Sequence, residues 1–494
     1  MARKGRSSRR RGNRGGDSDD EDNLSANGAA DYLSENHTID GLLSNSGDNT
    51  TLGSIPDDSS WGIHDDDDEA YQKKAGGDGD HRQSLEANEQ RLADLLGSTV
   101  PEFASEKRSS KREAVLKAWF RALTLYATLP PYDTVEEWRD ELVKACGSYA
   151  LLRGSPAEQY AGCRVLEAMA VLVGDHGLYE AVSKRLVRVV QATGRAVPVR
   201  VSALRALGML VFCGIDDEVV TESVLDLCEA ALAAEYRGQA TPPALRACAW
   251  RVWTLLATTV HELYVAGTDH ESTGRGLLLL PVVAECLEQA GDHSLREAAG
   301  QAMAYIHDCR LRLGPGGDDG ETGKSASQTK YELGSWEGSE WEDQVDEIGQ
   351  TIYELAHASG HHVSKKGKKE QRKVFRDYLG MLHDNETPEV VVQFRGGSLE
   401  LSTFGEICAL EFVRRCLQGG FQVQLLTNPT LQAVFGCDGT ALGSSGGGYS
   451  QLEKRLLLSK TSEASKIKDL DRHKGRKKRQ NVKNHFLTAD GDDI

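Results

Sequence analysis

A repeated helix start between residues 199 and 302 constrains the fold of this chain more than any other feature. Three copies share an apolar residue, an arginine and an alanine three residues later: Val199-Arg200-x-x-Ala203, Leu245-Arg246-x-x-Ala249 and Leu295-Arg296-x-x-Ala299. The first two arginines are 46 residues apart and the last two are 50 residues apart. Periods of about 40–47 residues are typical of HEAT and armadillo units. Since small alanines let neighbouring helices approach closely, the repeat predicts a helical solenoid, with an irregular helical bundle as the alternative.

Helical spacing of apolar residues extends this prediction over residues 84–358. Leu116, Trp119, Phe120 and Leu123 form one such stripe, and Pro-Pro and Gly-Ser-Pro breaks separate the helices. Residues 314–335 are rich in Gly, Asp, Ser and Lys, and we interpret them as a flexible insertion. The helix that follows carries one apolar face, made by Val345, Ile348, Ile352 and Leu355. No strand is predicted before residue 388.

The composition changes at residue 365, and residues 365–436 predict a small α+β domain. A lysine-rich start leads into a helix, and strands follow at residues 388–394 and 399–401. A helix is expected at residues 404–417. Alternation over residues 421–425 predicts a third strand, and Asn428-Pro429 predicts the start of a last helix. Residues 437–450 are interpreted as a Gly/Ser linker, and residues 451–487 as a basic terminal helix.

Charge is unevenly distributed along the chain. Residues 1–16 carry seven basic residues and no acid, and residues 453–487 carry a net charge of +8. Because the net charge of the whole chain is −17, the residues outside these two segments carry a net charge of −32. Residues 1–83 also hold few apolar residues and one acidic block at residues 65–69, so we expect a disordered leader. Basic ends on an acidic body suggest local docking on phosphate rather than contact over the whole surface.

The sequence offers no catalytic constellation, and we expect no enzyme, cofactor or small-molecule substrate. No Gly-x-Ser-x-Gly motif occurs, and Gly323-Lys324-Ser325 lacks the first glycine of a phosphate-binding loop because position 318 is Asp. The pair His361-His362 has no nearby cysteine or carboxylate at ligand spacing, so no metal site is expected.

Cysteine and hydropathy patterns complete these exclusions. The ten cysteines include no Cys-x-x-Cys pair, and most fall within apolar helical stretches, which indicates reduced core cysteines. No membrane association is expected, because the longest apolar run identified, residues 277–284, contains Pro281 and is shorter than the roughly 18–20 residues of a membrane span.

Two basic clusters are the candidate RNA-binding sites. The first lies in the terminal helix and comprises Lys466, Lys468, Arg472, Lys474, Arg476, Lys477, Lys478, Arg479 and Lys483. Residues three and four apart share a helix face, so a run this dense presents cations all round and suits a narrow RNA-lined passage. The second opens the helix at residue 365 and comprises Lys365, Lys366, Lys368, Lys369, Arg372 and Lys373. A nuclear localisation signal is the alternative for the first cluster, and a solvated linker for the second.

Two motifs in the last third carry a family resemblance. Gln371-Arg372-Lys373-Val374-Phe375-Arg376-Asp377 follows the lysine-rich start, and a closing motif runs from Gln424 through Asn428 to Val434-Phe435. In this order the chain resembles the interferon-related developmental regulator family, over residues 84–487. The resemblance implies an armadillo-like N-terminal domain and a family C-terminal domain. The long leader, the insertion at residues 314–335 and the spacer at residues 436–450 depart from the family pattern.

The resemblance implies two roles. One is a ribosome-binding repressor of translation, which docks on non-translating ribosomes and places its C-terminal helix in an RNA-lined channel. The alternative is a nuclear transcriptional co-regulator that bridges chromatin-modifying complexes. For the first role we expect ribosomal RNA as partner, protein partners on the concave face of the solenoid, and a cytoplasmic location. The second role requires a nuclear pool.

Overall fold

The computed structural model describes residues 78–267, 274–289, 292–313, 336, 339–357, 365–388, 390–394, 397–401 and 403–436. The fold over these residues is mainly α, as predicted, with two small antiparallel hairpins. The predicted leader before residue 78, the insertion at residues 314–335, the linker at residues 437–450 and the basic terminal helix lie outside the described residues. The predicted division into domains remains a prediction.

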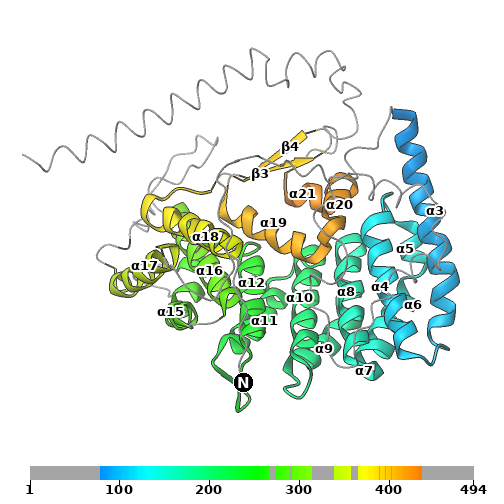
Figure 1. Ribbon diagram of the computed structural model, residues 1–494, viewed down its shortest axis with the longest axis horizontal. Coiled ribbons are helices and arrows are strands. Elements are labelled where there is room, and N and C mark those ends of the chain that lie inside the picture. The colour runs from blue at the N-terminus through cyan, green and yellow to red at the C-terminus, as the bar shows by residue number, and fades with distance from the viewer. Residues whose placement is uncertain are drawn as a thin grey trace, which may run out of the picture.

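One continuous row of helices forms the centre of the molecule (Figure 1). Each helix packs against the next in the order α3 (Asp78–Phe103), α4 (Ser109–Tyr126), α8 (Pro156–Val173), α10 (Val197–Gly214), α12 (Pro243–Ala257) and α16 (His293–Leu313). We call this the inner row. Helix α3 begins six residues before the predicted boundary at residue 84.

A second set of helices forms an outer row, with α7, α9, α11 and α15 along one side of the inner row (Figure 1). These are α5 (Asp133–Glu137), α6 (Arg139–Lys144), the π-helical turn η3 (Ala145–Ala150), α7 (Leu151–Arg153), α9 (His176–Gln191), α11 (Glu218–Leu232), α13 (Glu262–Ala266), α14 (Arg275–Leu278) and α15 (Leu280–Glu288). Helix α9 packs on α10, α11 on α12, and α15 on α16. From α8 to α12, consecutive helices thus alternate between the two rows, as in a stacked helical repeat.

The repeated arginine has a structural role at two of its three positions. Arg200 Nε donates to the carbonyl oxygen of Val190 at 2.8 Å, and Arg246 Nε donates to that of Leu232 at 2.7 Å. Both acceptors lie in the last turn of the preceding outer helix, where carbonyl groups have no partner within the helix. Each arginine therefore links an inner helix to the outer helix before it, which accounts for the period seen in the sequence.

Helix α10 lies deep in the core. It is long and apolar enough, by length and composition, to cross a membrane, which the sequence reading did not detect. Its neighbours α8, α9 and α12 surround it, and Leu204, Leu207 and Leu210 are fully buried among them. Gly208 permits the close approach of α12, since a Cβ there would come within 2.8 Å of Val252. A core helix of this kind is apolar because it is buried on most sides.

Local signals fix where several helices begin. Ser155 and Glu158 form a capping box at the start of α8, with Pro156 in the first helical position. Asp175 and Asp217 cap α9 and α11 in the same way, each accepting a hydrogen bond from a backbone N–H of the first turn.

The elements after residue 336 continue the array and then turn back across it. They are α17 (Glu342–His357), α18 (Lys365–Asp384), β3 (Val390–Phe394), β4 (Gly397–Leu401), α19 (Phe404–Leu417), the 3-10 turn η4 (Gln418–Gly420), α20 (Phe421–Thr427) and α21 (Pro429–Val434). The two strands pair antiparallel with Val392 opposite Leu399, and both side chains are buried. The predicted apolar face of α17, the two strands and the helix at residues 404–417 are confirmed.

The C-terminal helices lie across the inner row (Figure 1). Helix α19 contacts α8, α12 and α16, α20 contacts α4, and α21 contacts α8. Apolar residues of both parts belong to one hydrophobic core. We call this interface the C-terminal seam.

The predicted third strand at residues 421–425 is wrong, because these residues form α20. Alternation of Phe421, Val423 and Leu425 with glutamine predicted one buried and one exposed face. All five side chains are buried instead, since the two glutamines also face protein. Gly420 sets the turn before α20: a Cβ there would come within 2.5 Å of the Thr124 side chain.

A short hairpin, β1 (Glu235–Tyr236) and β2 (Gln239–Ala240), occurs where no strand was predicted. Its strands are two residues long, too short for any periodicity to be visible. The turn residues Arg237 and Gly238 both have positive φ, at 53° and 74°. Two left-handed residues are the turn geometry that matches the twist of paired strands.

The prediction for cysteine is confirmed for the described residues. Nine cysteines are unpaired, and eight of them are buried. Burial raises the pKa of the Cys163 thiol to about 12. The buried cysteines act as small apolar side chains of the core.

Candidate functional site

The first predicted RNA-binding cluster, from Lys466 to Lys483, lies outside the described residues. The structure therefore describes only part of the second cluster. The first turns of α18 contain four lysines of this cluster, of which the structure describes the helical backbone only: Lys365, Lys366, Lys368 and Lys369.

Arg372 and Lys373 continue the second cluster along α18. Arg372 is half-buried and Lys373 is exposed. One turn later, burial raises the pKa of Asp377, while the nearby Lys373 ammonium lowers it. The Asp377 carboxylate thus lies near the Lys373 ammonium and would compete with an RNA phosphate for it.

The aromatic part of the same motif fixes α18 to the array. Phe375 is fully buried, and its ring centroid lies 5.8 Å from that of Tyr378, which in turn lies 6.2 Å from Phe404 of α19. Both rings of α18 pack where α16 carries Gly300. The motif at residues 371–377 therefore combines a packing element with an exposed basic edge.

The closing motif forms the most specific contact of the C-terminal seam. The Gln424 side-chain amide is fully buried and donates to the carbonyl oxygens of Thr124 and Ala127, each at 3.0 Å. Asn428 is also fully buried; its Nδ2 donates to Val171 O at 2.9 Å. These acceptors lie at the C-terminal ends of α4 and α8, which leave carbonyl groups without helical partners. The two amides thus cap inner-row helices from outside.

The Asn428 side chain also makes hydrogen bonds within its own segment. Its Oδ1 accepts hydrogen bonds from the backbone N–H groups of Thr430 at 2.8 Å and Leu431 at 3.2 Å, which caps α21. Sequence reasoning identified the motif but assigned these residues no role. The signal available in the sequence was that Gln424 and Asn428 lie four positions apart, a spacing that places two side chains on the same side of a helix.

Polar contacts continue the seam along α19. Gln301 of α16 donates to Glu411 Oε2 at 2.8 Å, and burial raises the pKa of Glu411. Arg415 pairs with Glu297 at 3.1 Å at the more exposed edge. The seam therefore has an apolar centre and a polar border.

A charged group lies beneath α19. Glu167 is fully buried and accepts from Arg205 Nε at 2.8 Å and from Arg164 Nη1. The Arg164 guanidinium also lies 4.4 Å from the centroid of the Phe120 ring. Burial raises the pKa of Cys416 on α19, and Glu167 adds to this shift. Sequence reasoning missed this group, because each arginine falls within an apolar helix and gives no separate signal.

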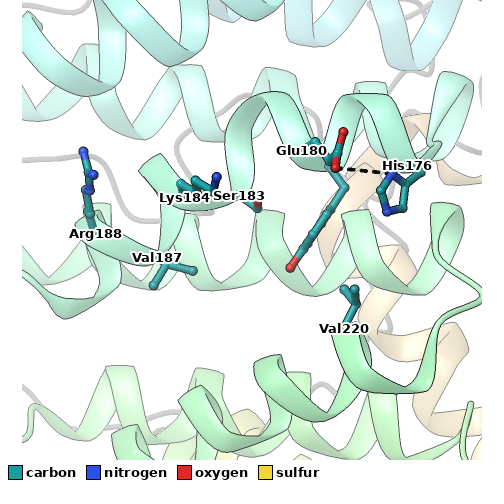
Figure 2. A pocket seen from close by; sticks show the side chains of 8 residues that line it. His176, Glu180, Ser183, Lys184, Val187, Arg188 and Val220 are labelled. Carbon is teal, nitrogen blue, oxygen red and sulfur yellow. Dashed lines mark ion pairs between the residues drawn. The ribbon is translucent and has the colours of Figure 1, made fainter.

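A groove lies between the outer helices α9 and α11 (Figure 2). Its volume is about 650 Å³. Its lining residues are His176, Tyr179, Glu180, Ser183, Lys184, Val187 and Arg188 of α9 and Val220 of α11. Burial raises the pKa of Tyr179. Sequence reasoning did not find this groove, because it depends on how far two outer helices lie apart.

Metal-ligating clusters are absent from the part of the chain that the structure describes, since no three His, Cys, Asp or Glu side chains gather there. The titratable groups of the C-terminal seam are paired or deeply buried. This arrangement is suited to binding and support rather than to proton transfer.

Comparison with known proteins gives two matches. The family model for interferon-related developmental regulators matches residues 59–383, which is more than half of the chain. The mouse protein named interferon-related developmental regulator 1 is 23% identical over 370 residues, covering 72% of this chain and 73% of the mouse protein. The matched region includes the repeats of the inner row and the motif at residues 371–377. The chain belongs to the interferon-related developmental regulator family.

Proposed function

We propose that this regulator acts without catalysis, by binding ribosomal RNA on non-translating ribosomes through its basic C-terminal segment. The observation that carries the proposal is the charge distribution: residues 453–487 hold a net charge of +8 on a chain of −17. A cationic segment on an acidic body directs phosphate contact to one place. Family membership supports the coarser statement that the protein is a regulator.

One feature of the described residues supports assigning RNA binding to the tail rather than to the helical array. Elements α19 to α21 occupy the face of the inner row that a solenoid would offer to a partner. Gln424 and Asn428 hold that face closed by capping α4 and α8. Protein partners on the concave face, as expected from the sequence, remain a further part of the proposal.

A nuclear co-regulator is the second candidate. The observation in its favour is the cluster Arg476-Lys477-Lys478-Arg479, which has the composition of a nuclear localisation signal. In that role the cluster serves import, and the helical array contacts chromatin-modifying complexes.

Sedimentation of cell extracts through sucrose gradients separates the two functions. We expect the full-length protein to comigrate with ribosomes at low salt and to dissociate at high salt, because phosphate contacts release counterions. Truncation after residue 452 should abolish comigration. Replacing Lys107 and Lys111 by alanine, two exposed lysines of the body, should leave it unchanged. Absence of comigration for the full chain, with nuclear accumulation that depends on Arg476 to Arg479, would reject the ribosomal role.

A further inference from the structure

The groove between α9 and α11 has one basic wall and one apolar wall. Lys184 and Arg188 of α9 are exposed along it, and Val187 lies between them (Figure 2). Across the groove, α11 contributes Val220, next to Val219, which is 72% exposed. Val219 is thus an exposed apolar side chain next to the half-buried Val220, which lies toward the His176 end of the groove (Figure 2).

Two carboxylates of α11 are paired outside this groove, whereas Asp217, just before α11, is close enough to add to the raised pKa of the lining Tyr179. Glu229 pairs with Arg275 of α14 at 2.7 Å, and Asp226 contacts the same guanidinium. The Asp217 side chain accepts from Val219 N at 2.9 Å and so caps its own helix. The lining carboxylate is Glu180 of α9, which has His176 3.8 Å away at the other end of the groove. The end marked by Lys184 and Arg188 is therefore cationic, and it suits a ligand that combines carboxylates with an apolar side chain.

The chain itself contains such a segment. Trp61-Gly62-Ile63-His64 is followed by Asp65-Asp66-Asp67-Asp68-Glu69, two large apolar side chains directly before five consecutive acids. The family match begins at residue 59 and so includes this segment. Sixteen residues lie between Trp61 and the start of α3 at Asp78, and an extended chain of these seventeen steps reaches about 55–60 Å.

The order of the outer helices places the groove within this reach. Helix α3 contacts α5, α5 contacts α6, and α6 contacts α9. Packed helices lie about 8–10 Å apart, so the axes of α3 and α9 are separated by at most about 30 Å over these three contacts, less than the reach of the extended tether. A tether of this length holds the segment at an effective concentration of the order of mM, which suffices for weak, charge-dependent docking.

We propose that the groove between α9 and α11 is the docking site of the chain's own segment at residues 61–69. Trp61 and Ile63 bind against Val187 and the valines of α11, and the acidic block faces Lys184 and Arg188. This inference goes beyond the ribosomal role and does not depend on it. Docking of the leader covers a basic surface of the body, so that the tail is the strongest cationic element exposed to solvent.

Site-specific photo-crosslinking in the full-length protein tests the proposal. A benzophenone amino acid replaces Val219, the exposed neighbour of the groove-lining Val220, or, as a matched control, Leu278 of α14, which is also strongly exposed at 60%. We expect peptides containing residues 61–69 to be captured from position 219 and not from position 278. The yield should fall roughly tenfold at 1 M salt, where exposed charges are screened within about 3 Å.

Charge reversal then identifies the contact. Lys184→Glu combined with Arg188→Glu should remove the crosslink, and replacing Asp65 to Asp68 by lysine in that variant should restore it. Reversal of Lys107 and Lys111 should have no effect. Three results would overturn the proposal: a yield that is insensitive to reversal at Lys184 and Arg188, equal capture from position 278, or crosslinks that join differently isotope-labelled copies in a mixed sample, since these would place a second molecule in the groove.

Discussion

At the scale of single residues, this protein relies on side chains that satisfy the ends of helices belonging to other parts of the chain. Arg200 and Arg246 do so within the repeat, and Gln424 and Asn428 do so across the C-terminal seam. Buried carbonyl groups without hydrogen-bond partners cost free energy, so each of these side chains stabilises the fold by donating to such a group. The same residues define the repeat and the closing motif in the sequence.

Replacing Gln424 by alanine is expected to lower the free energy of unfolding by about 1–3 kcal/mol, because buried acceptors in α4 lose their donor. Asn428→Ala should cost a similar amount and also remove the cap of α21. Urea denaturation followed by circular dichroism measures both changes. The control is Gln350→Ala, at an exposed position of α17, which should stay within about 0.5 kcal/mol of the wild type. Equal stability of all three variants would contradict the capping role.

His307 predicts a pH dependence. Its Nδ1 accepts from the Trp336 indole N–H at 2.8 Å, and its Nε2 lies 2.9 Å from Asn385 Oδ1, so the ring is held neutral between α16 and the end of α18. Burial lowers the pKa of His307, with Arg310 and His383 adding to the shift and the contact with Asn385 opposing it. Since the unfolded state then binds the proton more readily, this contribution to stability is present above about pH 6.5 and is lost as pH falls below that value.

Urea denaturation at a series of pH values tests this effect. The free energy of unfolding of the wild type should fall more steeply between about pH 7 and pH 5 than that of His307→Gln, which cannot titrate. Comparing slopes removes the constant cost of the substitution itself. Parallel slopes would show that His307 does not carry the pH dependence.

At the scale of elements, close contacts between helices decide the positions of the C-terminal parts. Gly300 of α16 lies under α18, where a Cβ would come within 2.8 Å of the Tyr378 ring and 3.3 Å of the Phe375 ring. Both rings are buried and leave little room to move. In contrast, a Cβ at Gly380 on α18 would meet no atom within 4 Å. Close packing therefore requires a glycine at position 300, whereas no neighbouring atom requires one at position 380.

Alanine substitution should therefore have opposite signs at these two positions. Gly380→Ala is expected to stabilise the protein by about 0.5–1 kcal/mol, because alanine favours the helix. Gly300→Ala gains the same helix propensity but forces α18 away from α16, at an overpacking cost of about 1–3 kcal/mol, so it should destabilise. Thermal unfolding of both variants measures the difference. A stabilised Gly300→Ala protein would show that α18 packs less closely than described.

The elements also show what sequence alone could predict. Helix α19 followed directly from the helical spacing of its apolar residues, and the strands β3 and β4 from their β-branched and apolar runs. Helix α20 did not, because both of its faces are buried and glutamines occupy positions that usually face solvent. The group of Arg164, Glu167 and Arg205 was equally hidden, since charged residues inside apolar helices become meaningful only when α8 and α10 lie side by side.

At the scale of the whole molecule, the array and its C-terminal seam form one packed body, and the basic segment follows it in the sequence. The inner row binds the chain's own α19 to α21, and the acidic body disfavours contact with nucleic acid elsewhere. The proposed docking of residues 61–69 would place a further acidic segment on the body. In this account RNA contact belongs to residues 466–483, with the exposed edge of α18 as a minor contributor.

Ultraviolet crosslinking of the full-length protein to ribosomal RNA, followed by mapping of the linked peptides, tests this claim most directly. The account predicts that most linked peptides come from residues 466–483, and that neutralising Arg476, Lys477, Lys478 and Arg479 removes them. Linked peptides confined to residues 78–436, or crosslinking that survives this neutralisation, would contradict it.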